Sequence, residues 1–309
     1  MQPELTTRAW ADLILLGLIW GASFLAIKLA LGELPVITLV AHRVFWAAAL
    51  LWALALWRGW SMPRGARIWG AFLVMGTLNN IVPFLLMAWG QQFIETGLTA
   101  IFNSATAIWG VLVAALFFAD ERLSARRVTG VALAFGGVVL ALGAEALRGF
   151  DLRSLAQLAV LAGTLSYAFA SAWARSRLSH LPPQVAATGM LTAASALMLP
   201  LALILDGPPQ VPSLAITYAA IAYYALPGTA LAYLLYYRIV AQAGSGNAML
   251  VTLIIPPISI ILGAVTLGER LAPTAIGGFV LIAAGLVVLD GRIPRRLSHF
   301  LAARNRAPR

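Results

Sequence analysis

The side chains that could do chemistry in this sequence are polar residues inside long apolar runs. Asn79 and Asn80 lie near the middle of the uncharged run 68–94, and Phe84 follows Asn80 by one helical turn. Amides at such a depth in lipid usually face a cavity or a neighbouring helix. They could therefore bind the polar end of a small solute, or they could only hydrogen-bond to another helix. Because adjacent residues point about 100° apart on a helix, we expect at most one amide to face the centre squarely.

Two further uncharged runs, 96–119 and 239–268, each carry a continuous polar face with residues spaced by three and four. The two faces coincide to within one residue when the chain is shifted by 148 residues. Small polar stripes permit close helix packing, but two matching stripes also predict a shared substrate path. The candidate substrate ligands on these faces are Asn103, Thr106, Met249 and Thr252.

Prolines interrupt the second of these faces. Pro256 and Pro257 lie midway along the run 239–268, where they remove backbone donors and bend the helix. The carbonyl groups near Thr252 would then lack their usual partners and could bind substrate, or the bend could act as a hinge. Many proline bends in membrane helices do neither. Gly110 is the hinge candidate on the first face.

Aromatic and cationic side chains complete the candidate site. Rings deep in an apolar run could stack on an apolar or aromatic solute, although core packing is the alternative for each ring. A cation two turns into a run could bind a substrate carboxylate, or it could reach the membrane surface as a topology or gate residue. The candidates of these kinds are Trp20, Phe24, His42, Arg43, Tyr167 and Tyr224.

Other chemistries find little support in the residues. The chain has no cysteine and its three histidines are scattered, so we expect no metal site, no cofactor and no enzyme activity. No carboxylate falls in the middle of an apolar run, and a proton-coupled exporter usually needs such a group. This favours gradient-driven efflux over tight proton antiport, with His42 as the best proton carrier if coupling exists.

The composition places these side chains in a membrane. Hydrophobic residues make up 61% of the 309 residues and charged residues only 10%, against about 25% in soluble domains, and the mean hydropathy is +0.89. Because about 20 apolar residues cross a bilayer core, the windows between charges predict ten transmembrane helices in an all-α fold. The first window, 13–31, is taken as a span rather than a cleaved signal peptide.

The net charge of +10 is distributed as a topology signal. If the N-terminus is cytoplasmic, 16 of the 21 Lys and Arg residues lie on the cytoplasmic side and five on the other. We therefore expect both termini in the cytoplasm, in the inner membrane of a bacterium, and no binding of nucleic acid. The basic tail 292–309 is expected to contact anionic lipid headgroups.

The chain reads as a duplication. A shift of 148 residues places 121–123 on 269–271, and it places glycines of the fifth predicted span on glycines of the tenth. The units are 1–147 and 148–291, each with five spans. Because five is odd, the units must lie in opposite orientations, as in transporters built from inverted repeats. Close helix packing is the simplest explanation of the matched glycines, and a homodimer face is the alternative, so we expect a monomer or a homodimer. The matched glycines are Gly130, Gly137, Gly278 and Gly285.

These residues also carry a family resemblance. The run 20–28, Pro35 followed by Arg43, and the segments 120–123 and 268–271 resemble the EamA-type drug/metabolite transporter superfamily over nearly the whole chain. The resemblance implies a ten-helix bundle with a central cavity, and a substrate path formed mainly by the first, third, fourth, sixth, eighth and ninth helices. It also implies export of amino acids, other small metabolites or drugs, with aromatic amino acid exporters of the YddG type as the suggested members.

Three function classes follow from these observations. The first is a secondary transporter that exports small metabolites, chiefly aromatic or other neutral amino acids, by alternating access, with a multidrug or other metabolite efflux carrier as its variant. The second is an intramembrane enzyme, which would need clustered catalytic groups at the membrane boundary. The third is a channel, against which the duplicated bent helices and the absence of charged pore rings argue. We expect the first.

Overall fold

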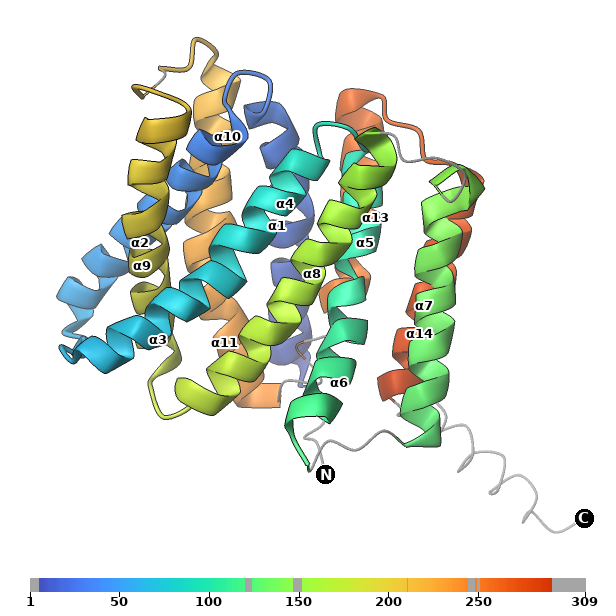
Figure 1. The fold of residues 1–309 in the computed structure, drawn as a ribbon, viewed down its shortest axis with the longest axis horizontal. Coiled ribbons are helices and arrows are strands. Elements are labelled where there is room, and N and C mark those ends of the chain that lie inside the picture. Colours follow the sequence, from blue (N-terminus) through green and yellow to red (C-terminus); the bar gives the residue numbers. More distant parts are fainter. Residues whose placement is uncertain are drawn as a thin grey trace, which may run out of the picture.

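The computed structural model describes residues 6–119, 124–146, 152–209, 211–243, 248 and 251–290. Every regular element in these residues is helical, so the all-α prediction is confirmed for them. The helices run up and down between two ends of the molecule (Figure 1). In chain order they are α1 (Thr7–Ala30), α2 (Val36–Arg58), α3 (Ala66–Gly76), η1 (Thr77–Ile81), α4 (Val82–Gly90), α5 (Thr96–Asn103), α6 (Ala105–Phe117), α7 (Ala125–Ala146), α8 (Leu152–Arg177), α9 (Pro183–Leu205), α10 (Ala215–Ala225), η2 (Leu226–Leu231), α11 (Ala232–Ala243), α13 (Val251–Leu267) and α14 (Pro273–Asp290).

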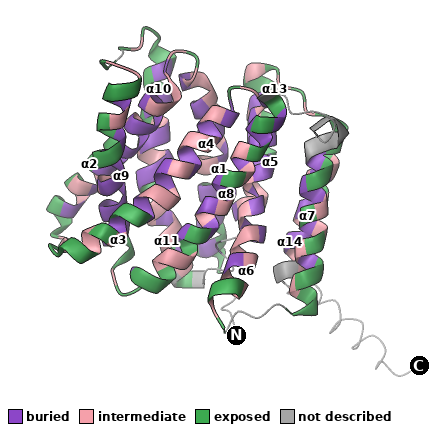
Figure 2. Cartoon of the chain, viewed as in Figure 1, coloured by how far each residue is buried: buried purple, intermediate pink, exposed green. Residues whose placement is uncertain are grey.

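Several of these helices have the length and apolarity of membrane spans. Within the described residues, seven helical segments are long and apolar enough to cross a bilayer, and α13 and most of α14 form shorter apolar helices. Large apolar side chains remain on the outer surface, for example Leu56 and Val265, which are 78% and 82% exposed. Figure 2 shows exposed residues along the outer faces of the bundle. Such a surface is stable in lipid and not in water, so the protein is a multi-pass membrane protein.

Two spans contain a short π-helical segment at matching places. η1 separates α3 from α4, and η2 separates α10 from α11. Their first residues, Thr77 and Leu226, lie 149 residues apart, close to the shift of 148 that relates the two parts of the sequence. In each segment the backbone bond runs over five residues, from Val82 N to Thr77 O and from Ala232 N to Pro227 O. Such bulges often occur at functional sites.

The fourth predicted span is divided at Ser104, between α5 and α6. The Ser104 hydroxyl donates a hydrogen bond of 2.9 Å to the carbonyl oxygen of Thr252. This carbonyl is one of those that Pro256 leaves without a helical donor, so a neighbouring helix supplies the missing bond. The other hinge candidate, Gly110, lies inside the unbroken helix α6, and Pro256 and Pro257 lie inside α13.

The helices α7 and α14 pack against each other as a pair (Figure 1). A Cβ atom added to Gly137 would lie 2.6 Å from the carbonyl oxygen of Gly278, and one added to Gly285 would lie 2.6 Å from that of Gly130. Real Cβ atoms do not approach oxygen atoms so closely. The repeated glycines therefore serve close helix packing within one chain.

Carboxylates join helices at the end where α2, α5 and α10 begin, which we call the cap end (top of Figure 1). Asp206, which follows α9, accepts hydrogen bonds from the backbone nitrogen of Thr38 (2.8 Å) and from its hydroxyl (2.6 Å). Glu269, which precedes α14, accepts bonds from the backbone nitrogen of Thr96 (2.8 and 3.0 Å) and from its hydroxyl (2.8 Å). Each acid thus caps the N-terminus of a helix from the other part of the chain.

Glu33, in the turn between α1 and α2, caps α10 in the same way. Its oxygens accept bonds from the backbone nitrogens of Ser213 (3.0 Å) and Leu214 (3.1 Å), and from the hydroxyls of Ser213 and Thr217. Bonds from the Ser213 and Thr217 side chains are the main reason that the pKa of the Glu33 carboxyl falls from 4.5 to about 2. The carboxylate therefore stays ionised throughout the physiological range.

Candidate functional site

The candidate site is built around Arg43, a buried cation on α2. Its Nε donates a hydrogen bond of 2.7 Å to the hydroxyl of Thr229 in η2, and its Nη1 donates one of 2.8 Å to the hydroxyl of Tyr224 in α10. The Thr229 hydroxyl in turn donates to the carbonyl oxygen of Tyr224 (2.9 Å). The π-helical segment η2 thus brings the Thr229 hydroxyl to the guanidinium of Arg43. A regular α-helix would place this threonine elsewhere.

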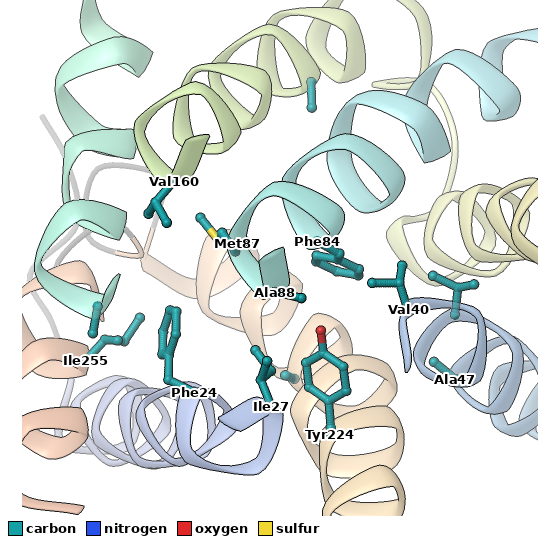
Figure 3. Close-up of a cluster of buried hydrophobic side chains, with 14 of the residues drawn as sticks. Phe24, Ile27, Val40, Ala47, Phe84, Met87, Ala88, Val160, Tyr224 and Ile255 are labelled. Carbon is teal, nitrogen blue, oxygen red and sulfur yellow. The ribbon is translucent and has the colours of Figure 1, made fainter. Parts of the chain in front are cut away.

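Two aromatic rings enclose the guanidinium of Arg43. Its Cζ lies 3.4 Å from the ring centroid of Phe84 and 3.9 Å from that of Tyr224. Both rings are buried in the core, with exposures of 2% and 0%. Figure 3 shows the Phe84 ring and the Tyr224 hydroxyl pointing toward each other. Cation–π contacts of this kind stabilise a charge that is removed from water.

Both adjacent amides of η1 converge on one hydroxyl. The Nδ2 atoms of Asn79 and Asn80 lie 2.9 and 3.0 Å from the hydroxyl oxygen of Tyr233 in α11. The expectation that at most one of them faces the centre rests on a separation of about 100° between adjacent residues. It assumed an α-helix, whereas the wider turn of a π-helix rotates successive residues by a smaller angle. Asn80 is fully buried, and its Oδ1 has no hydrogen-bond partner among the described residues.

Further aromatic residues extend from this cluster. Tyr167 lies on α8 and Tyr233 on α11, and both side chains are half-buried. Tyr236 and Tyr237 follow on α11, with ring centroids 5.6 Å apart, and the ring of Trp20 on α1 lies 5.8 Å from that of Tyr236. All five of these aromatic side chains are half-buried.

The structure places several other candidates away from Arg43. The ring nitrogen Nδ1 of His42 accepts a bond of 3.3 Å from Trp46 Nε1, on an exposed part of α2. Phe24 is buried in the core (Figure 3), and its carbonyl oxygen accepts a bond of 3.1 Å from Gln91 Nε2. His42 and Phe24 therefore have other partners than the Arg43 cluster.

The two polar faces are only partly described. Asn103 and Thr106 flank the break at Ser104 and are half-buried, and the Thr106 hydroxyl has no partner among the described residues. Thr252 meets Ser104 through its carbonyl oxygen, and Met249 lies outside the described residues. An apolar cavity of about 270 Å³ between α6, α7 and α8 contains none of the candidate residues.

Sequence reasoning missed the role of Thr229 and Tyr233. Thr229 lies in a stretch with Pro227 and Gly228 that signals irregular backbone, but the pattern does not show that the backbone is π-helical. Tyr233 is one of several tyrosines in the same span, and only the fold distinguishes it.

Lys28, which closes α1, donates to the carbonyl oxygens of Gln91 and of Ile94 (3.1 Å) and so ties α1 to the end of α4.

Several known proteins are similar to this chain over most of its length. "Uncharacterized transporter YoaV" of Bacillus subtilis is 21% identical over 94% of this chain and 99% of its own length. "Probable amino-acid metabolite efflux pump" of Salmonella typhimurium is 24% identical over 89% of this chain and 92% of its own length. "Probable terminal-alkyne amino-acid exporter" of Streptantibioticus cattleyicolor is 26% identical over 94% and 95% of the two chains.

A solved crystal structure shares the fold, with a TM-score of 0.68 at 22% identity over 94% of this chain and 99% of that chain. The model of the EamA-like transporter family matches the chain twice in succession, at residues 9–143 and 154–289. The two matches cover most of the chain, and each contains one of the two π-helical segments. This protein therefore belongs to the EamA-like transporter family.

Proposed function

We propose that this protein is a secondary transporter that exports small metabolites, amino acids among them, and is not an enzyme. The names of relatives as amino-acid exporters support the substrate class. Two successive family matches support two five-helix units, 1–147 and 148–291, that form a ten-span inverted repeat. The bias of positive charge supports cytoplasmic termini in a bacterial inner membrane.

The observation that carries the proposal is the joint construction of the Arg43 cluster by both units. The first unit supplies Arg43, Phe84 and the amides of η1, and the second supplies Thr229, Tyr224 and Tyr233 from the α10–η2–α11 span. Substrate sites of inverted-repeat transporters lie where the repeats meet, and discontinuous helices form them. Relative movement of the two units would change such a site from one side of the membrane to the other.

Flux through proteoliposomes tests the proposal. Vesicles that contain the purified protein are loaded with a panel of radiolabelled solutes, which includes aromatic and aliphatic amino acids, small organic acids and a cationic dye. We expect efflux of at least one small metabolite down its gradient above that of empty vesicles. Flux of only a lipid or an inorganic ion would contradict the proposal, and dye efflux alone would indicate the multidrug variant.

A matched pair of variants ties the flux to the site. Asn80→Leu removes an amide that bonds Tyr233, and we expect it to lower the flux at least tenfold while the protein stays folded in detergent. Gln92→Leu changes an exposed amide in the turn between α4 and α5 and should leave the flux unchanged. Equal flux in both variants would place the substrate path elsewhere.

A further inference from the structure

Arg43 is a buried cation whose neighbours carry no compensating carboxylate within the described residues. Five carboxylates have side chains that the structure describes, and each of these five has a partner near one end of the bundle, not at Arg43. These acids are Asp12, Glu33, Glu95, Asp206 and Glu269. The groups that contact Arg43 are two neutral hydroxyls and two rings. The described part of the site therefore has a formal charge of +1.

The site also has more unused hydrogen-bond donors than unused acceptors among the described residues. A guanidinium has five N–H donors, and the described residues accept bonds from two of them. The remaining donors suit an acceptor-only group such as a carboxylate, which arginine binds in a bidentate manner. On the acceptor side, the Oδ1 of Asn80 is buried without a partner, while the carbonyl oxygen of Tyr224 already accepts a bond from Thr229. An ammonium group has three donors and carries a charge, which one neutral amide oxygen does not compensate.

Net charge then distinguishes two classes of solute. A zwitterionic amino acid is neutral overall, so its entry leaves the site at +1 and adds a second buried cation. A monoanionic carboxylate brings the site to zero and uses the free guanidinium donors. Uncompensated charge in a low-dielectric interior is unfavourable. On the basis of the proposed function, we infer that the Arg43 site prefers monoanionic carboxylates with an apolar or aromatic body, such as N-acylated amino acids, over zwitterionic amino acids.

This preference would make export electrogenic without a coupling ion. A bacterial membrane potential is negative inside, and each 100 mV favours a monoanion on the outside by about fiftyfold. A zwitterion gains nothing from the potential. Electrogenic export of a monoanion would then explain both the outward direction of transport and the absence of a carboxylate near Arg43 among the described residues.

Three solutes with the same ring test the inference: N-acetylphenylalanine as monoanion, phenylalanine as zwitterion and phenylalanine amide as cation. Proteoliposomes receive a potassium gradient and valinomycin to set the potential. We expect N-acetylphenylalanine to move at least tenfold faster than phenylalanine, and faster still toward the positive side. Phenylalanine flux equal to or above that of N-acetylphenylalanine would overturn the inference but support the transporter proposal. Absence of flux for the whole solute panel would instead contradict the transporter proposal itself.

Variants of the cation complete the test. We expect Arg43→Gln to bring the anion-to-zwitterion flux ratio to about one, and Arg43→Lys to keep part of the preference because it keeps the charge. Arg58→Gln, at an exposed position at the far end of α2, should leave the ratio unchanged. If Arg43→Gln does not fold, the wild-type protein decides the question by itself. Its unfolding temperature should rise more with N-acetylphenylalanine than with phenylalanine at equal concentration, and the reverse order would overturn the inference.

Discussion

At the cap end, three carboxylates cap helices of the other part of the chain and a fourth, Glu95, pairs with Arg153. At the opposite end the described residues show one carboxylate bonded across the two parts, Asp12 with Arg238. The three capping carboxylates each accept a backbone N–H and a hydroxyl at the start of a helix. At the opposite end, the Arg238 side chain is 45% exposed. Carboxylates at helix N-termini gain from the helix dipole, while half-exposed ion pairs contribute little.

The difference indicates which end opens with less work. Movement of the two units apart at the cap end breaks three sets of charge-assisted hydrogen bonds and the Glu95–Arg153 pair. Among the described residues, movement at the opposite end breaks the part-buried Asp12–Arg238 pair and the bond of 3.0 Å from Trp173 Nε1 to the carbonyl oxygen of Ala71. With cytoplasmic termini, as proposed, the cap end faces outward, and carboxylates of each unit bond to the other unit there. Under the proposed alternating access, substrate binding would offset the loss of the caps before the outer end opens.

The largest expected effect comes from removal of all three caps in the variant Glu33→Gln, Asp206→Asn, Glu269→Gln. At about 1 kcal/mol for each of the Asp206 and Glu269 caps, the equilibrium should shift toward an open cap end by at least about thirtyfold. The probe is the substitution Ile94→Cys, since Ile94 is 2% exposed at this end and the chain has no cysteine of its own. Its reaction with a membrane-impermeant thiol reagent should accelerate by a comparable factor.

The control for this experiment is Asp12→Asn in the same Ile94→Cys background, which changes only the opposite end. It should leave the labelling rate at position 94 unchanged. If the triple variant reacts no faster than the parent, the caps do not hold the cap end closed and the comparison of the two ends fails.

A smaller effect is expected on stability from single alanine substitutions. Glu269→Ala leaves the backbone N–H and hydroxyl of Thr96 without their acceptor, and it should lower the free energy of unfolding by about 2 kcal/mol. Asp12→Ala breaks the half-exposed pair and should lower it by less than about 1 kcal/mol. Urea unfolding in detergent micelles measures both. A larger loss for Asp12→Ala would reverse the order of the two ends.

The smallest effect is the pH dependence of the Glu33 cap. The carboxyl has a pKa of about 2 in the folded protein against 4.5 for the free group. A lowered pKa contributes stability that is fully present above about pH 4.5 and is lost as the pH falls toward 2. We therefore expect the unfolding temperature of the wild type, compared with that of Glu33→Gln, to lose its advantage within this interval. An advantage that persists unchanged at pH 2 would contradict the assigned cap.

Composition and spacing were enough for the class of fold and for part of the site. Long apolar windows require helices in lipid, because an unbonded backbone is too unfavourable there. Arg43, Asn80 and Tyr224 could be recognised as candidate site residues because a polar or cationic group inside an apolar window is costly and usually functional. The glycines that recur after 148 residues could be recognised as packing positions, and the structure places them between α7 and α14.

Which of these residues meet depends on the packing of the helices in three dimensions. Periodicity assumes a regular helix, and the π-helical segments η1 and η2 break that assumption where Asn79, Asn80 and Thr229 lie. Contacts across the two parts of the chain, such as Arg43 with Tyr224 over 181 residues, depend on how helices pack and leave no local signal. Composition and spacing alone predict polar groups buried in a membrane bundle, because a polar side chain is costly in contact with lipid. The packing of the helices decided their partners, because partner choice is a matter of geometry at long range.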